Sequence, residues 1–139
     1  MAMEIRPLSV GDDRMVIGAS HLFDSPAREV ATSRFLPDGR HHLLVAYDAE
    51  KPIGFVTGVE MTHPDKGTEM FLYELEVEEA FRRQGVGRAL VDRLGEVARE
   101  RGCYGMWVVT DEDNGAARAT YQTTGGTPEL RQIVFTWTF

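Results

Sequence analysis

A segment of six residues in the second half of the chain combines positive charge with a glycine-rich turn. They read Arg82-Arg83-Gln84-Gly85-Val86-Gly87, and Arg88 follows within an amphipathic segment. The first N–H groups of a helix have no partner inside the helix, and the helix dipole adds partial positive charge there. The two glycines let the chain turn tightly and let a bulky anion approach the backbone. The sequence therefore predicts that this turn binds a phosphate or a pyrophosphate.

Three phosphate-binding motifs use turns of this kind. A P-loop ends in Gly-Lys-Ser/Thr, whereas Arg88 and Ala89 follow Gly87, so that motif is excluded. A dinucleotide fingerprint needs a third glycine where Leu90 stands, and it opens the first βα unit of a parallel fold. The remaining motif is the loop that holds the pyrophosphate of coenzyme A.

Several carboxylates are expected near this turn in the folded chain. Glu74 and Glu76 lie two residues apart on an expected strand, so they share one face of it. Either one could serve as a general base beside a reacting amine, or could be a solvated strand carboxylate. Asp24 and the acidic run 111–113 fall on loops that we expect at the same end of the fold. A ring of carboxylates would attract a substrate with several ammonium groups, although it could also be only a solvated surface.

The hydrophobic pattern predicts the elements that position these residues. We expect the order β-α-α-β-β-β-α-β-α-β, with one mixed central sheet in an α/β (α+β) domain. The strands are expected over 5–8, 43–47, 53–60, 71–77, 104–110 and 133–139, and the helices over 12–23, 26–35, 86–101 and 114–124. The helix over 86–101 connects the fourth and fifth strands as a crossover, so those strands should run parallel.

Alternation along the fourth and fifth strands predicts which side chains face the core. The fourth strand should place Phe71, Tyr73, Leu75 and Val77 on one face, and Leu72, Glu74 and Glu76 on the other. The fifth is apolar nearly throughout, which is typical of a strand buried on both faces. We therefore expect Met106 and Trp107 in the core.

Composition narrows the class of protein. The 139 residues fit a single domain, 1–139, and no apolar run is long enough to cross a membrane. The start of the chain lacks a signal-peptide profile, and the single cysteine excludes an intrachain disulfide framework, so we expect a cytoplasmic protein. The net charge of −7 disfavours nucleic acid as a partner. The four histidines show no metal-ligand spacing, and Cys103 is expected to be an inert core thiol.

Two motifs at the correct spacing resemble the GNAT N-acetyltransferase superfamily. The Arg82-x-x-Gly85-x-Gly87 turn, which follows Leu75 and Val77, is similar to its acetyl-coenzyme A signature. The segment Asn114-x-x-Ala117-x-x-x-Tyr121 is similar to its late helix. The order of elements also agrees, so the resemblance covers nearly the whole chain. It implies that strands four and five splay apart around the pantetheine arm of acetyl-CoA, and that an amine attacks the thioester directly without a metal.

The resemblance also implies roles for individual residues. Tyr121 would donate a proton to the leaving thiolate, although it could be a packed core tyrosine. Glu74 or Glu76 would act as the base. Asn114 would bind the coenzyme or an ordered water, and it would also cap its helix. The coenzyme-binding residues would be Leu75, Val77, Arg82, Arg83, Gln84, Gly85, Val86, Gly87, Arg88, Asn114, Ala117 and Tyr121.

Within the superfamily the chain looks most like the aminoglycoside 3-N-acetyltransferases. The segments that carry this likeness are 22–24, 73–77 and 110–114. It implies an antibiotic-resistance acyltransferase, a homodimer, and a small polycationic amine as substrate. The substrate-binding residues would be Phe23, Asp24, Glu74, Glu76, Asp111, Glu112 and Asp113. A polyamine, a metabolite amine or a peptide N-terminus remains an alternative acceptor, and a non-catalytic acyl-CoA-binding module remains an alternative class.

Overall fold

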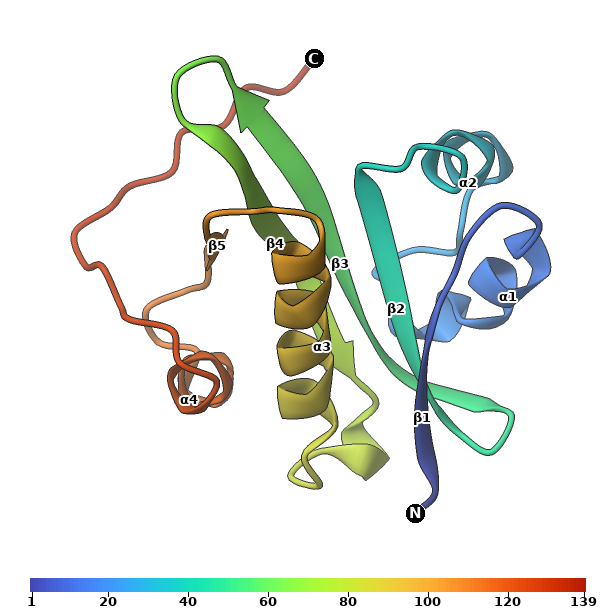
Figure 1. The fold of residues 1–139 in the computed structure, drawn as a ribbon. Coiled ribbons are helices and arrows are strands. Elements are labelled where there is room, and N and C mark those ends of the chain that lie inside the picture. The colour runs from blue at the N-terminus through green and yellow to red at the C-terminus, as the bar shows by residue number, and fades with distance from the viewer.

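The computed structural model describes residues 1–139 as one five-stranded sheet with helices on both faces (Figure 1). The strands are β1 (Met3–Pro7), β2 (His41–Asp48), β3 (Lys51–His63), β4 (Gly67–Val77) and β5 (Met106–Val108). The α-helices are α1 (Asp13–Gly18), α2 (Glu29–Phe35), α3 (Val86–Glu100) and α4 (Gly115–Thr123), and two 3₁₀ turns are η1 (Ser20–Leu22) and η2 (Glu79–Phe81). No helix combines the length and the apolar composition that a bilayer crossing requires.

The sheet is mixed, as the sequence predicts. Its spatial order is β1-β2-β3-β4-β5, with antiparallel pairing throughout except between β4 and β5, which are parallel. The helix α3 makes the connection between these two strands, so the predicted crossover is confirmed. The first turn of α3 lies against the end of β4, since a Cβ at Gly87 would be 3.6 Å from Val77 Cγ2.

Two apolar clusters hold the layers together. The first lies between the sheet and α3, where Leu90 and Leu94 pack against Val56 and Leu72. The second lies on the opposite face, where Val16 and Leu22 pack against the β2 and β3 side chains. The helices of this second layer cover β2 and β3, and the outer part of β4 and β5 on that face remains exposed.

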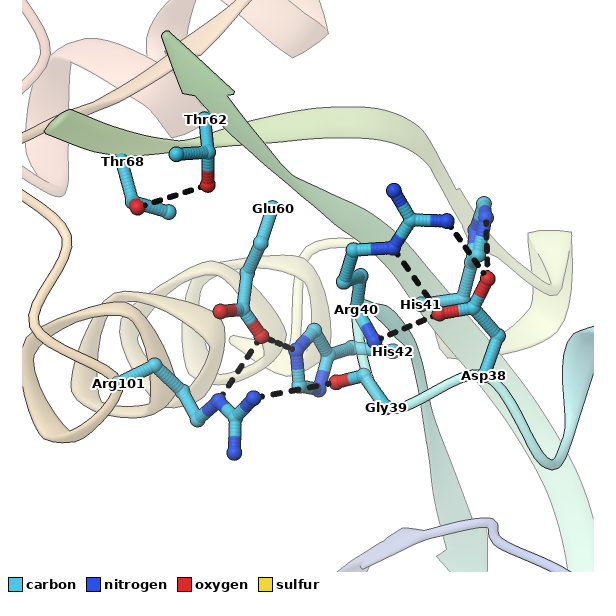
Figure 2. Close-up of polar contacts among 9 residues, drawn as sticks. All are labelled: Asp38, Gly39, Arg40, His41, His42, Glu60, Thr62, Thr68 and Arg101. Atoms are coloured by element: carbon cyan, nitrogen blue, oxygen red, sulfur yellow. Dashed lines mark hydrogen bonds and ion pairs between the residues drawn. The ribbon is translucent and has the colours of Figure 1, made fainter. Parts of the chain in front are cut away.

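A buried carboxylate fixes the far end of α3. Glu60, on β3, is only 8% exposed, and its Oε2 lies 2.7 Å from His42 Nε2 and accepts a hydrogen bond from Arg101 Nε at 2.9 Å. Figure 2 shows the carboxylate between these two partners, with Arg101 coming from the C-terminal end of α3. Burying a carboxylate without partners is costly, so this cluster ties α3 to β2 and β3.

A bulge in β4 overturns the predicted alternation of that strand. Thr57 pairs with Glu74 and Gly58 pairs with Leu72, so Tyr73 is an extra residue without a partner on β3. One extra residue exchanges the faces of every residue after it. Leu75 therefore packs against the α3 cluster together with Leu72, which the alternation had placed on opposite faces.

The fifth strand is shorter and more exposed than predicted. It covers Met106–Val108 instead of 104–110, and it forms one edge of the sheet. Tyr104, Trp107 and Val109 are exposed, so the prediction that both faces are buried and that Trp107 lies in the core is wrong. Met106 does pack against the α3 cluster. The continuous apolar run reflects an uncovered edge and not a central strand.

The strand predicted over 133–139 does not form, so the predicted element order is wrong at its last position. Residues 127–139 contain no regular secondary structure and all are exposed. The alternation gives β-propensity, but a strand also needs a neighbour for its N–H and C=O groups, and one copy of the chain supplies none here.

The first two helices are shorter than predicted. The helix expected over 12–23 is divided into α1 and η1, and the helix expected over 26–35 begins only at Glu29. Ser20 accepts a hydrogen bond through its side-chain oxygen from the Ala27 N–H, which holds the intervening residues in a loop.

Candidate functional site

A cleft of about 540 Å³ opens where β4 and β5 part. Its lining residues come from the end of η1 and the residues that follow it, the second half of β4, the end of β5 with the segment after it, and α4 with its N-cap. They are Leu22, Asp24, Tyr73, Glu74, Leu75, Glu76, Val108, Val109, Thr110, Asp111, Asn114, Ala117 and Tyr121. The cleft therefore joins four segments of the chain, and one of its lining residues, Leu75, packs against Gly87 in the first turn of α3.

The cleft exists because β4 and β5 stop pairing. Their ladder contains three pairs and ends with Leu72 opposite Val108, immediately before the bulged residue Tyr73. Past this point the edge of β4 that faces β5 has no strand partner. The bulge is held open partly by Thr57, whose hydroxyl oxygen accepts a hydrogen bond from the Glu74 N–H at 3.2 Å. Free backbone groups on a strand edge can pair with an extended ligand.

The glycine turn forms an open helix N-terminus. Gly85 is the N-cap of α3 with a left-handed φ of 83°, and no side chain caps this end. A side chain at Gly85 would meet nothing within 4 Å, so the space above the turn is open. The first backbone hydrogen bond across this turn runs from the Ala89 N–H to the Gly85 carbonyl oxygen, and the N–H groups before it have no helical partner. This arrangement suits an anion.

The arginines of the turn have different partners. Arg82 donates through Nε to the Val77 carbonyl oxygen at 3.0 Å and through Nη2 to Glu76 Oε1 at 2.9 Å. It therefore fastens the turn to the end of β4. Arg83, which has a left-handed φ of 62°, and Arg88 are exposed and make no salt bridge. These two side chains are the ones that can add positive charge around a phosphate.

Two further residues of the turn contribute to its shape. Gln84 donates through Nε2 to the Ala80 carbonyl oxygen at 3.3 Å, and Val86 is buried in the α3 cluster. Gly87 lies where an added Cβ would be 3.6 Å from Val77 Cγ2 and 3.8 Å from Thr120 Cγ2. The turn is thus packed underneath, against β4 and α4, and open above.

Glu74 and Glu76 differ in their surroundings. Burial raises the pKa of the Glu74 carboxyl, and the negative charges of Asp24 and Glu76 raise it further. Glu76 forms an ion pair with Arg82 at 2.9 Å, which directs its carboxylate toward the turn. Of the two β4 glutamates, Glu74 is therefore the one without a cationic partner, and its raised pKa suits a proton acceptor.

Tyr121 and Asn114 place α4 against the cleft. The Tyr121 ring is half-buried and packs against the α3 cluster, and burial raises the pKa of its hydroxyl. Tyr121 therefore keeps its proton at neutral pH and can donate it. Asn114 caps α4, because its Oδ1 accepts a hydrogen bond from the Ala117 N–H at 3.1 Å. Its amide N–H groups remain as donors beside the cleft.

The structure gathers most of the predicted substrate residues, but not all. Asp24 and Asp111 line the cleft with the two β4 glutamates. Phe23 instead packs edge-on against Phe55, with ring centroids 4.9 Å apart, in the second apolar cluster. Glu112 and Asp113 are exposed and are not among the lining residues.

Some lining residues were missed by the reasoning from sequence. They are Leu22, Tyr73, Val108, Val109 and Thr110. Tyr73 was assigned to the same face as Leu75, and only the bulge reveals that it is free to border the cleft. The signal available in the sequence was the apolar-to-polar change after Val109, which is typical of a strand end.

Other chemically reactive side chains lie away from the cleft. Cys103 lies beyond the C-terminal end of α3, and burial raises the pKa of its thiol, which disfavours the reactive thiolate. No group of three His, Cys, Asp or Glu side chains is arranged to hold a metal ion.

Comparison with known proteins yields a family match and a relative. The acetyltransferase (GNAT) family profile matches residues 13–125. A ribosomal protein bS18-alanine N-acetyltransferase of Escherichia coli is 35% identical over 57 residues, which are 41% of this chain. That match spans only 38% of the relative's length.

Solved structures share the complete fold. An aminoglycoside acetyltransferase from an uncultured soil metagenomic sample, in complex with sisomicin, superposes with a TM-score of 0.90 and 21% identity over 99% of this chain and 96% of the other. The aminoglycoside N-acetyltransferase AAC(6')-Iy, in complex with CoA, gives a TM-score of 0.83 and 21% identity over 98% and 95%. At these identities the likeness concerns the fold.

The glycine turn can be tested with a matched pair of variants at the two ends of α3. Gly85 and Gly102 both have left-handed φ angles, of 83° and 78°, and open space at the Cβ position. Valine at either site strains the backbone by about 1–3 kcal/mol. We expect Gly85→Val to weaken coenzyme A binding at least about tenfold, which is about 1.4 kcal/mol. Gly102→Val should leave binding unchanged.

Isothermal titration calorimetry with coenzyme A measures both variants, and thermal unfolding shows whether the two lose similar stability. Equal affinities for coenzyme A in the wild type and Gly85→Val would contradict the role of this turn.

Proposed function

The chain belongs to the acetyltransferase (GNAT) family, and we propose that it transfers the acetyl group of acetyl-CoA directly to a primary amine of an aminoglycoside. The observation that carries this proposal is that two features lie close together. An open helix N-terminus suited to a pyrophosphate packs against Leu75, which lines the cleft, and carboxylates suited to a polycation line the same cleft.

The coenzyme fits the cleft in a defined direction. Its pyrophosphate would bind the N–H groups at the start of α3, with Arg83 and Arg88 beside it. Its pantetheine amides would pair with the β4 edge beyond Leu72, where the ladder with β5 has ended. The thioester would then lie between Leu75 and Tyr121, and a β4 N–H would stabilise the oxyanion as the amine attacks.

Proton transfers follow from the positions of two side chains. The Glu74 carboxylate accepts the proton that the substrate ammonium must lose before its nitrogen can attack the acetyl carbon. The new C–N bond forms, the C–S bond breaks, and the coenzyme thiolate takes a proton from the Tyr121 hydroxyl. Glu76 contributes negative charge near the acceptor and, through Arg82, holds the turn in place.

The acidic rim supports a polycationic acceptor. Asp24, Glu74 and Asp111 line the cleft, and the whole chain carries a net charge of −7, so ammonium groups are attracted to the site. The aminoglycoside-bound neighbour of the same fold supports this substrate class. The sequence resemblance favours acetylation at the 3-N position, whereas the name of AAC(6')-Iy refers to another position. Two-dimensional NMR of the product assigns the acetylated nitrogen.

A second candidate acceptor is a peptide N-terminus. The relative named as a ribosomal protein bS18-alanine N-acetyltransferase matches this chain over 57 residues. A chain that binds acetyl-CoA without turning it over would be a non-catalytic acyl-CoA-binding module.

An acceptor panel distinguishes these possibilities. Thiol release from acetyl-CoA is followed with sisomicin, a linear polyamine, and a peptide that begins with alanine. We expect the highest kcat/KM with sisomicin, and a decrease as ionic strength rises, because salt screens the attraction between the rim and the ammonium groups. The highest rate with the peptide would replace the proposed acceptor, and no release with any amine would indicate the non-catalytic module.

Glu74 is tested by its effect on the pH profile. The pKa of its carboxyl is raised above 4.5, so the acid limb of the wild-type kcat/KM profile should lie above that pH. Glu74→Gln should lower kcat/KM by about 10²-fold and remove that limb. The matched variant Glu76→Gln should stay within about fivefold, since an exposed ion pair contributes under about 1 kcal/mol.

Stability provides a second measurement on Glu74→Gln. A raised folded-state pKa means that the stabilising contribution of Glu74 is complete below its unfolded pKa and is lost as pH rises through the folded pKa. At neutral pH the ionised carboxylate thus disfavours folding, and the variant should be at least as stable as the wild type. An unchanged pH profile would exclude Glu74 as the base.

Tyr121 is tested against Tyr104, an exposed tyrosine whose hydroxyl pKa is also raised. Tyr104 donates a hydrogen bond to Glu69 away from the cleft. Tyr121→Phe should lower kcat by about 10²-fold or more with little change in coenzyme A affinity, because only the proton donor is removed. Tyr104→Phe should leave both unchanged. A parallel loss of kcat, affinity and thermal stability in Tyr121→Phe would show a packing role.

A further inference from the structure

Tyr73 is an exposed aromatic residue at the cleft, and it takes no part in the proposed proton transfers. It is 66% exposed and is one of the residues that line the cleft. As the bulged residue of β4 it has no partner on β3. An aromatic ring that borders a polar cleft in this way offers a large apolar face to a ligand.

The bulge places Tyr73 on the same side of the sheet as Glu74. In a regular strand two consecutive side chains point to opposite faces. Here Leu72 and Leu75 both pack into the α3 cluster, so the two residues between them face the other side. Asp24 lines the same cleft, and its charge adds to the effect of burial on the pKa of the Glu74 carboxyl. The Tyr73 ring is therefore a neighbour of the carboxylate that we assign as the base.

Two further aromatic rings restrict the position of the Tyr73 ring. Phe71 comes two residues earlier on β4, and its ring centroid lies 5.9 Å from that of Tyr73 and 4.4 Å from that of Trp107. Phe71 and Trp107 are also partners across the ladder between β4 and β5. Aromatic rings at these distances attract each other beyond the surface that they bury. The row of three rings thus holds Tyr73 at the cleft while most of its side chain stays accessible.

The strand across the cleft contributes an apolar group as well. The ladder ends with Leu72 opposite Val108, so Tyr73 and Val109 are the next residues on the two strands where these part. Val109 is 54% exposed and also lines the cleft. Apolar groups and carboxylates therefore border one opening, and a ligand that satisfies both carries an apolar face together with positive charge.

An aromatic face beside a carboxylate distinguishes between classes of amine. The C–H groups of a saturated sugar or cyclitol ring form an apolar face that can cover an aromatic ring, and a nearby ammonium group is attracted to the negative face of that ring. A linear polyamine can satisfy the carboxylates, but it has no ring to place on Tyr73. It also loses more conformational freedom when it binds.

We propose that Tyr73 is a specificity-determining residue of the acceptor site, and that its ring stacks on the saturated ring that carries the reacting amine while Glu74 faces that amine. This role rests on the proposed function, because it concerns the same acceptor site. It narrows the acceptor to an amine borne by a ring, as in an aminosugar or an aminocyclitol, and it disfavours an amine on an open chain.

Calorimetric binding of sisomicin to the chain, with and without coenzyme A, tests this contact without turnover. Tyr73→Ala should weaken sisomicin binding at least about tenfold, whereas Tyr73→Phe, which keeps the ring, should stay within about threefold. Spermine is the matched ligand, because it is a linear polyamine with several ammonium groups. Its affinity should change less than about threefold in Tyr73→Ala, since the carboxylates that attract it remain.

Tyr104→Ala is the control variant. Tyr104 is 60% exposed, a value similar to that of Tyr73, but it does not line the cleft. This variant should bind both amines like the wild type. Thermal unfolding and coenzyme A affinity show whether the variants are folded, and both should be close to wild type in Tyr73→Ala because its side chain lies mostly in water.

Steady-state kinetics adds a readout that a merely structural role would not produce. Tyr73→Ala should raise the KM for sisomicin about tenfold at nearly unchanged kcat, because the contact to the ring is present before and during the reaction. The acid limb of the pH profile, which we assign to Glu74, should keep its position. A loss of kcat at unchanged KM would contradict a role in holding the ring.

The outcomes separate this role from the proposed function. If the wild type binds sisomicin and Tyr73→Ala binds it equally well, or loses sisomicin and spermine to the same extent, the role of Tyr73 is overturned and the aminoglycoside remains the acceptor. If the wild type binds no sisomicin, the proposed acceptor itself is overturned, and the role of Tyr73 with it.

Discussion

The candidate site depends on the early end of the ladder between β4 and β5. Three residue pairs hold the strands together, and the bulged Tyr73 stands at the point where they part. A parallel ladder that continued would pair the β4 backbone groups and fill the space between the strands. Because the ladder stops, a cleft opens between the two strands, and the β4 edge inside the cleft has free backbone groups. Residues of four different segments line this cleft.

The cleft has a fixed position relative to the N-terminus of α3 because this helix is held in place at both ends. The buried Glu60 carboxylate, with His42 and Arg101, fixes the C-terminal end to β2 and β3. Arg82 fastens the preceding turn to the end of β4 at the other end. Between these points Leu90 and Leu94 pack against the sheet. The helix dipole therefore points at a fixed place beside the cleft, and an anion that binds there has a defined distance to Glu74 and Tyr121.

Burial and like charge act together on the cleft residues. The pKa of Glu74 rises because the carboxyl is partly removed from water and faces Asp24 and Glu76, and the pKa of Tyr121 rises through burial alone. Glu76, a similar side chain two residues away, is paired with Arg82 and takes a structural part. The Arg82 guanidinium thus distinguishes the two glutamates: it pairs with Glu76, and it leaves Glu74 as the proposed proton acceptor. Stability at neutral pH is lower with an ionised Glu74, a cost that is common where a site must titrate.

Residue types and spacing within single segments were enough to predict the glycine turn and the helix that follows it, the parallel crossover, and four of the six acidic residues expected around the site. These depend on local chemistry, since backbone N–H groups, glycine φ angles and helical periodicity act over a few residues. Contacts between distant segments were needed to show that Tyr73 is bulged, that Leu75 shares a face with Leu72, that Arg82 holds Glu76, and that β5 is an edge strand. The tertiary structure also decided that the pattern over 133–139, which has the propensity of a strand, remains unpaired in one copy. Register, ion pairing and strand partners depend on residues distant in the chain, and alternation within one segment contains no information about them.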